Sequence, residues 1–96
     1  MLNIPPSSIQ KLSLPAKEKA ALWYFKKELL KRLGGEVREI LLFGSKARGD
    51  WHKYSDTDIL VVMRAARKNE RDIILDIETE ILLKYGLRTS TFSISA

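Results

Sequence analysis

The chain has 96 residues, 45% of them hydrophobic, which is the size and composition of a single small globular domain. It contains no cysteine, which excludes disulfide bonds and thiolate metal sites, and no apolar run reaches the length of a transmembrane helix. A formal charge of +5 favours an anionic partner such as a nucleotide, a nucleic acid or an acidic protein, although thermophile surfaces show similar charge.

The N-terminal part is expected to comprise an arm and a helix. Residues 1–14 carry two of the three prolines and are predicted to form an extended arm, which leaves residues 15–96 as the domain. Pro15 suits the first turn of a helix that runs to about Leu33 and stops at Gly34. Apolar residues recur in this helix every three or four positions and are expected to face the core: Leu22, Phe25, Leu29 and Leu33.

Two strands are predicted next, Glu36 to Phe43 and Asp56 to Met63. Both are rich in aliphatic residues and are bounded by turn-forming residues, so we expect them to be central strands of a sheet. The loop between them, residues 44–55, is rich in glycine, serine and charged side chains.

A second helix is predicted from a cap at Asn69 to Gly86, followed by a strand over residues 87–94 whose polarity alternates too weakly to fix its facing. A small mixed sheet with helices packed on one face is an α+β fold. The residues of the second helix that we expect to be buried are Ile74, Ile77, Ile81 and Leu82.

The most informative stretch joins the first two predicted strands. The first strand ends at Gly44 and Ser45, where backbone N–H groups and a hydroxyl can hold a phosphate. Arg48 is close enough in sequence to bring a planar guanidinium to the same group. Asp56 and Asp58 are two residues apart on a strand, so both carboxylates share one face, with Cα atoms about 6.5 Å apart. Such a pair can hold one divalent cation or two.

Eight positions of this stretch together resemble the signature of the minimal nucleotidyltransferases, the small branch of the DNA polymerase β-like superfamily. They are Gly44, Ser45, Ala47, Arg48, Gly49, Ser55, Asp56 and Asp58. The resemblance implies the polymerase β-like fold for residues 15–96. It also implies Mg²⁺-dependent transfer of a nucleoside monophosphate, AMP from ATP, to an acceptor hydroxyl. Asp56 and Asp58 are then the catalytic metal ligands, and Gly44, Ser45 and Arg48 bind the nucleotide.

The sequence departs from this family in one respect. Members of the superfamily usually have a third carboxylate on a later strand, whereas the last predicted strand here has none. Asp76, Glu78 and Glu80 are close in sequence, but we expect them to form the solvated face of the second helix. An alternative function is therefore a nucleotide-binding module with weak or no catalysis, which acts by protein contact.

The resemblance also suggests partners. Minimal nucleotidyltransferases are commonly encoded beside a helical HEPN protein, where they act as the antitoxin of a toxin–antitoxin pair and some transfer AMP to a tyrosine of the toxin. A HEPN partner is therefore expected, and Trp23 and Tyr24 are either partial core or a contact in a homo-oligomer. A nucleic-acid-binding domain is the second alternative, because the chain is basic. We expect a cytoplasmic protein, since the N-terminus does not resemble a signal peptide.

Overall fold

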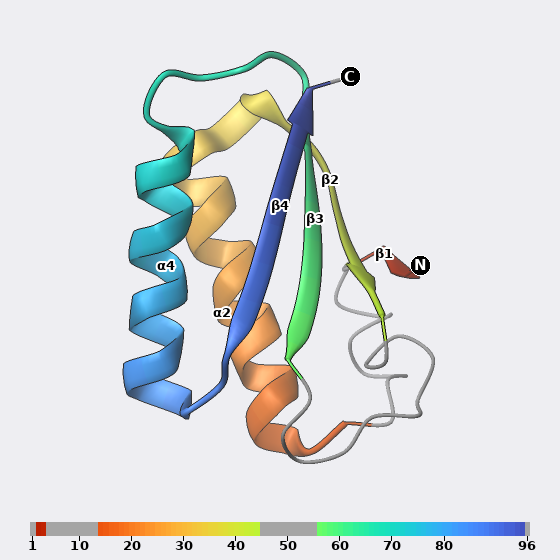
Figure 1. Cartoon of the computed structure of the whole chain (residues 1–96), viewed down its shortest axis with the longest axis vertical. Coiled ribbons are helices and arrows are strands. Elements are labelled where there is room, and N and C mark those ends of the chain that lie inside the picture. Colours follow the sequence, from red (N-terminus) through yellow and green to blue (C-terminus); the bar gives the residue numbers. More distant parts are fainter. Residues whose placement is uncertain (1, 4–13, 45–55, 96) are drawn as a thin grey trace.

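The computed structural model describes residues 2–3, 14–44 and 56–95. Figure 1 shows the described elements, two long helices and the strands of one sheet. In chain order they are β1 (Leu2–Asn3), α2 (Ala16–Leu33), the 3-10 helix η1 (Gly34–Glu36), β2 (Val37–Phe43), β3 (Thr57–Met63), α4 (Glu70–Tyr85) and β4 (Thr89–Ser95).

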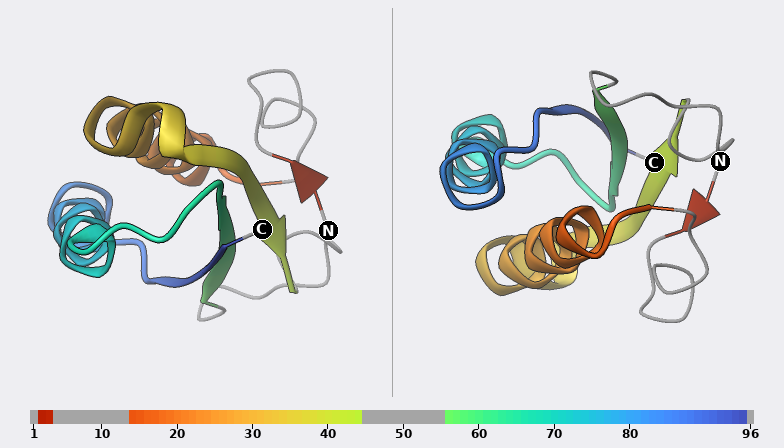
Figure 2. Two further views of the ribbon diagram at one scale, coloured as in Figure 1. Left: turned by 90° about the horizontal axis from the view of Figure 1, so that it is seen from above. Right: turned by 90° about the horizontal axis from the view of Figure 1, so that it is seen from below.

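The four strands form one mixed sheet in the order β1-β2-β3-β4. β2 pairs antiparallel with both β1 and β3, whereas β4 is parallel to β3 because α4 carries the chain back to the starting end of the sheet. Both helices lie on one side of the sheet (Figure 2). The α+β fold and the central position of β2 and β3 are therefore confirmed.

Helix α2 follows the sequence prediction closely. It begins directly after Pro15 and ends at Gly34, whose φ of 54° is unfavourable for residues with a Cβ. The predicted stripe is confirmed, since Leu22, Phe25, Leu29 and Leu33 are all buried in the main core. Burial of each such side chain contributes about 2 kcal/mol to folding.

Helix α4 agrees less completely with the prediction. Ile74, Ile77 and Ile81 are buried, but Leu82 is 49% exposed, so its predicted burial is wrong. One turn spans 3.6 residues, so the position after Ile81 is rotated by about 100° away from the buried stripe. Asn69 does stand at the N-cap position, yet its side chain makes no capping hydrogen bond; instead the Arg67 backbone N–H donates to the side chain of Glu70.

A polar cluster joins the two helices. The Tyr24 hydroxyl donates to Glu80, and the Arg32 guanidinium donates to Glu80 at 2.8 Å and to Glu28 at 2.9 Å. The hydrogen bond from Tyr24, followed by that from Arg32, lowers the pKa of the Glu80 carboxyl below its usual value. Glu80 therefore bridges the helices, and its predicted place on a solvated face is wrong.

One face of the sheet packs against the helices. The other is covered by none of the described helices or strands and is called the open face below. Helix-facing positions of β2 and β3, such as Leu42, Ile59 and Val61, are buried in the core. On β4 the side chains that face the helices include the buried Thr91, whereas Phe92 and Ile94 are 55% and 50% exposed. The sequence left the facing of this strand undecided, and the structure directs its large apolar residues away from the helices.

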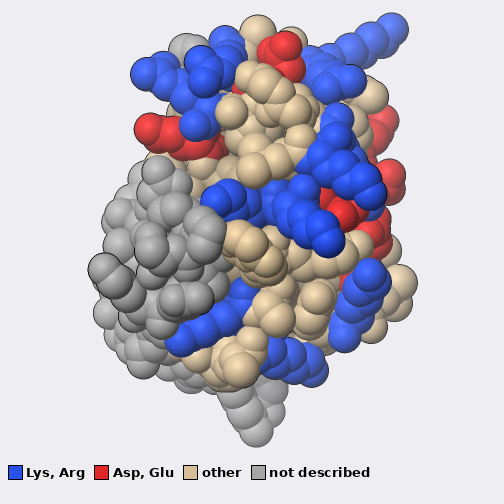
Figure 3. All heavy atoms as spheres, turned by 180° about the vertical axis from the view of Figure 1, so that it is seen from behind, with Lys and Arg blue, Asp and Glu red and all other residues tan. Residues whose placement is uncertain are grey.

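Basic side chains are prominent on the side of the molecule that faces away from the viewer in Figure 1. Figure 3, seen from behind, shows Lys and Arg in several groups around uncharged surface. A hollow of about 390 Å³ on α2 is lined by Trp23, Lys26, Lys27 and Leu30.

Neither described helix combines the length and the hydrophobicity that a membrane span requires.

Candidate active site at the ends of β2 and β3

The candidate site begins where β2 ends. Gly44 follows the last residue of this strand and has a φ of +75°, a conformation that turns the chain out of the sheet and that L-residues rarely adopt. Phe43, the residue before it, pairs with Asp58 across the antiparallel ladder. The turn therefore starts directly beside one of the two predicted metal ligands.

Contact between Gly44 and Asp58 is unusually close. A Cβ placed on Gly44 would lie 2.3 Å from the Oδ2 atom of Asp58, a separation that real Cβ atoms do not show. The Asp58 carboxylate thus occupies the space that any other side chain at position 44 would need. The sequence suggested that this glycine lets a phosphate approach the backbone; the structure adds that it makes room for a carboxylate.

The two aspartates lie on either side of a buried threonine. Thr57 is 1% exposed and its backbone N–H donates to the Arg88 carbonyl at 3.0 Å, which anchors the start of β3 to β4. Side chains alternate along a strand, so Asp58 is directed to the open face. Asp56 comes directly before β3, and the same alternation predicts its carboxylate on that face. Asp56 is exposed and Asp58 is half-buried.

This pair of carboxylates fits a hard divalent cation. Within the described residues neither Asp56 nor Asp58 has a hydrogen bond or ion pair to another side chain or backbone group. Mg²⁺ is commonly held by one or two carboxylates together with the phosphates of a substrate. No group of three or more His, Cys, Asp or Glu that could hold a metal is found in the described part of the chain. The described protein ligands would therefore be the two aspartates.

Ser90 occupies the position next to Asp58 on β4. The parallel register pairs Asp58 with Ser90, so the two side chains share the open face. The sequence showed that the last strand lacks an acid, but it did not show which residue lies beside the aspartates, because that depends on strand register. Glu78 does not supply the missing carboxylate, since it accepts a hydrogen bond from the Thr89 hydroxyl at 3.4 Å on the helix side of the sheet.

Two of the predicted nucleotide-binding residues, Ser45 and Arg48, lie outside the described residues. The same holds for the rest of the loop, residues 45–55. The structure thus brings together Gly44, Asp56 and Asp58, and the other assignments stay predictions.

Comparison with known proteins identifies the family. The family described as "Nucleotidyltransferase domain" matches residues 24–91, which include both strands of the site. Three relatives from Methanocaldococcus jannaschii are each named "Putative protein adenylyltransferase". The first, MJ0604, is 40% identical over 70 residues, covering 73% of this chain and 66% of the relative.

The other two relatives are less similar. MJ1305 is 35% identical over 69% of this chain and 47% of its own length, and MJ0141 is 34% identical over 69% of this chain and 68% of its own length. The chain thus spans less than two thirds of the first two relatives. No solved structure matches the chain. The predicted resemblance is confirmed: this chain belongs to the nucleotidyltransferase domain family, and its two described strands with Gly44, Asp56 and Asp58 are part of the matched region.

Proposed function

We propose that this chain is a Mg²⁺-dependent adenylyltransferase that transfers AMP from ATP to a hydroxyl group of a protein. The observation that carries the proposal is the Asp58 carboxylate packed against Gly44 at the end of β2, with the exposed Asp56 two residues before it. Family membership supports nucleotidyl transfer, and the names of the relatives support adenylyl transfer to protein.

The proposed reaction is a substitution at the α-phosphorus of ATP. The acceptor oxygen forms a bond to that phosphorus, the bond to the bridging oxygen of the β-phosphate breaks, pyrophosphate leaves, and the acceptor proton passes to solvent. Asp56 and Asp58 would hold Mg²⁺, which when bound offsets phosphate charge and lowers the pKa of the attacking hydroxyl. We assign the β- and γ-phosphates to the backbone at Gly44 and to Ser45 and Arg48.

The biological role that we propose follows from the resemblance to the minimal nucleotidyltransferases. Residues 15–96 would be the domain, and its acceptor would be a HEPN-type toxin that the chain inhibits as an antitoxin. The matched region, residues 24–91, falls within this domain.

One observation favours a second candidate, a nucleotide-binding module with weak or no turnover. Ser90 is the partner of Asp58 on β4, where a third carboxylate would complete the site. A serine cannot hold a second cation as a carboxylate does, nor accept the proton of the acceptor near neutral pH. In this candidate the chain binds ATP and acts on its partner by contact alone.

Incubation with α-labelled ATP and Mg²⁺, with and without a co-expressed HEPN protein, tests the proposal. The variants are Asp56→Asn/Asp58→Asn and, as a matched control, Asp72→Asn/Asp76→Asn, which removes two exposed carboxylates from α4. We expect mass spectrometry to find AMP on protein with wild type and with the control, and none with the Asp56/Asp58 variant.

The outcomes separate the two candidates. ATP binding that needs Asp56 and Asp58 but produces no labelled protein would favour the contact module. Equal labelling by wild type and the Asp56/Asp58 variant would remove the basis of the site assignment.

A further inference from the structure

The open face of the sheet is an ordered array of side chains around Asp58. Strand register defines three rows across β2, β3 and β4. The first row is Phe43, Asp58 and Ser90, the second is Leu41, Leu60 and Phe92, and the third is Glu39, Val62 and Ile94. Residues in register share a face, so these nine positions form one surface.

Most of this surface is apolar, and its two large side chains on β4 are exposed. Phe92 is 55% exposed and Ile94 is 50% exposed, although both are large hydrophobic residues. The rings of Phe43 and Phe92 lie 6.0 Å apart, so they meet above β3 next to Asp58. Val62 is buried yet does not belong to the helix-side core, which places it on this face. Contiguous exposed apolar surface of this kind marks sites of protein contact.

Phe92 and Ile94 form an apolar platform that lies next to the candidate site on the open face. The geometry of the proposed reaction indicates which substrate binds there. If the β- and γ-phosphates bind at Gly44, the leaving pyrophosphate lies at the end of β2. Attacking and leaving oxygens are roughly in line in phosphoryl transfer. The acceptor must then approach Asp58 from the opposite side, which is the side of β4 with Ser90 and Phe92.

The charges of the face favour a protein acceptor over a nucleic acid. None of the nine positions is Lys or Arg, and two of them, Glu39 and Asp58, are acidic. A phosphate backbone binds mainly through contacts with Lys and Arg, which these nine positions do not offer. Basic side chains instead surround the surface seen from behind in Figure 3.

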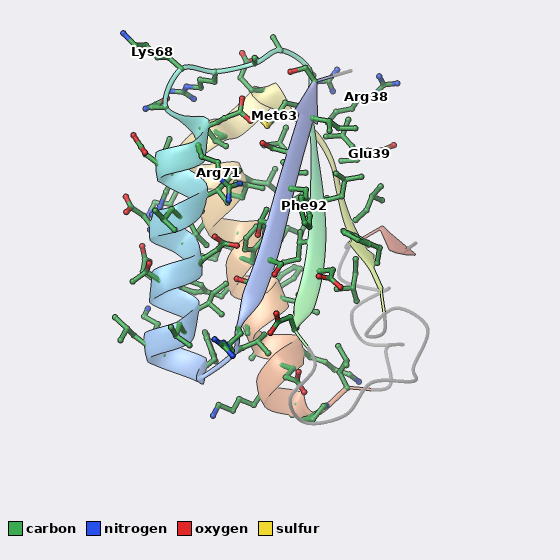
Figure 4. The ribbon with its side chains drawn as sticks, in the orientation of Figure 1. Arg38, Glu39, Met63, Lys68, Arg71 and Phe92 are labelled. Atoms are coloured by element: carbon green, nitrogen blue, oxygen red, sulfur yellow. The ribbon has the colours of Figure 1, made fainter. Side chains whose placement is uncertain are left out.

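The free edge of β4 is a less suitable contact than its face. Since the Arg88 carbonyl accepts from Thr57, the alternation of a parallel ladder turns the carbonyls of Thr89, Thr91 and Ser93 away from β3. Arg71 reaches from α4 toward β4 in Figure 4, and its guanidinium donates to the Thr91 carbonyl at 3.0 Å. Such a cap protects an edge strand from pairing with another strand.

We propose that the apolar platform of Phe92 and Ile94 is the docking surface for the acceptor protein. A segment of that protein places apolar side chains on the platform and so delivers its hydroxyl to Asp58. This inference rests on the proposed function, and it names a surface and a partner class for the same site.

The test measures AMP transfer from α-labelled ATP with Mg²⁺ to proteins in a soluble extract of the source organism. The variant Phe92→Ser/Ile94→Ser makes the platform polar on a strand that already contains serine and threonine. The control Leu75→Ser/Leu82→Ser changes two leucines on α4 that are 56% and 49% exposed, which matches the exposure of the platform residues. Phe92→Leu/Ile94→Val keeps the platform apolar. MgATP affinity and the melting temperature are measured for every variant.

We expect the Phe92/Ile94 serine variant to label protein about 10- to 100-fold less than wild type, the range for loss of two well-packed contact residues. Its MgATP affinity and melting temperature should match wild type, and both other variants should label normally. Undiminished labelling by the serine variant would overturn the docking surface and leave the proposed function intact, as would an equal loss in the α4 control. Label that ribonuclease removes and protease does not would overturn the protein assignment. A wild type that binds MgATP and labels nothing would overturn the proposed function and the docking surface with it.

Discussion

Gly44→Ala should separate the role of this glycine in the site from its role in the turn. The new Cβ would lie 2.3 Å from the Asp58 Oδ2 atom, whereas ordinary contact begins near 3.4 Å. The carboxylate must therefore move by about 1 Å, which its side chain can do without moving the backbone. A displacement of this size in a catalytic group costs about 100-fold in rate.

The same substitution also strains the backbone, and this effect needs its own control. An L-residue with φ near +75° costs about 1 to 2 kcal/mol, partly offset by the lower entropy of the unfolded chain. Gly86→Ala provides the match, because Gly86 has a φ of +65° and its Cβ would meet only the Lys17 ammonium, at an ordinary 3.6 Å. Both variants should lose about 1 kcal/mol of unfolding free energy.

Only the Gly44 variant should lose function. Urea unfolding gives the stability of the two proteins, and titration with MgATP and the rate of AMP transfer give their activity. Equal activity in Gly44→Ala and Gly86→Ala would refute the argument that Asp58 must occupy the space beside position 44. A parallel loss of activity in both would show that stability alone explains the effect.

Three further predictions concern single side chains. Ser90→Asp places a third carboxylate beside Asp58, and without metal the like charges should lower the unfolding free energy by up to about 1 kcal/mol. Mg²⁺ should raise the melting temperature and the rate of AMP transfer of this variant more than those of wild type. An absent Mg²⁺ effect would contradict the register of β4 on β3. Thr57→Val should raise the unfolding free energy by about 1 kcal/mol, because the buried hydroxyl of Thr57 has no hydrogen-bond partner among the described residues. The MgATP affinity should not change. A lower melting temperature of the variant would contradict the expected gain in stability. For Glu80 the folded pKa is lowered, chiefly by the hydrogen bond from Tyr24, so its contribution is present above the unfolded pKa of about 4.3 and is lost as the pH falls through the folded value. Urea unfolding at pH 7 should therefore show Glu80→Gln less stable than wild type by at most about 1 kcal/mol, a limit set by its 32% exposed side chain. The difference should shrink as the pH is lowered through the lowered pKa of Glu80, and a difference that grows in acid would contradict the argument.

Local sequence signals predicted most of the fold. The predicted helix from Pro15 to Leu33 is observed as Ala16–Leu33, and the second predicted strand, Asp56 to Met63, as Thr57–Met63. These elements have a clear apolar period and end at glycine or at turn residues, so their bounds depend on neighbours in the sequence. The predicted burial of Leu82 was wrong because we assumed that an apolar residue next to the buried stripe of a helix is itself buried.

The last strand shows why the remainder could not be predicted. In most strands the larger apolar residues face the core, which would put Phe92 inside and Thr91 outside. The structure has the reverse, with Thr91 5% exposed against the helices and Phe92 on the open face. Facing is set by the register of β4 on β3, and register depends on how α4 returns the chain to the sheet.

The reversed facing of β4 and the missing carboxylate have a common consequence for the site. The same register that places Ser90 beside Asp58 places Phe92 beside Leu60, so β4 offers the reaction an apolar surface and a hydroxyl instead of an acid. A strand that aided catalysis by charge would need an acid at position 90, and exposed Phe92 and Ile94 would add nothing to that chemistry. A strand that positioned an acceptor would need the apolar residues and could function with serine at position 90. Under the proposed function, the side chains of β4 therefore favour a role in binding the acceptor protein, and the proposed metal ligand of the sheet is Asp58 on β3.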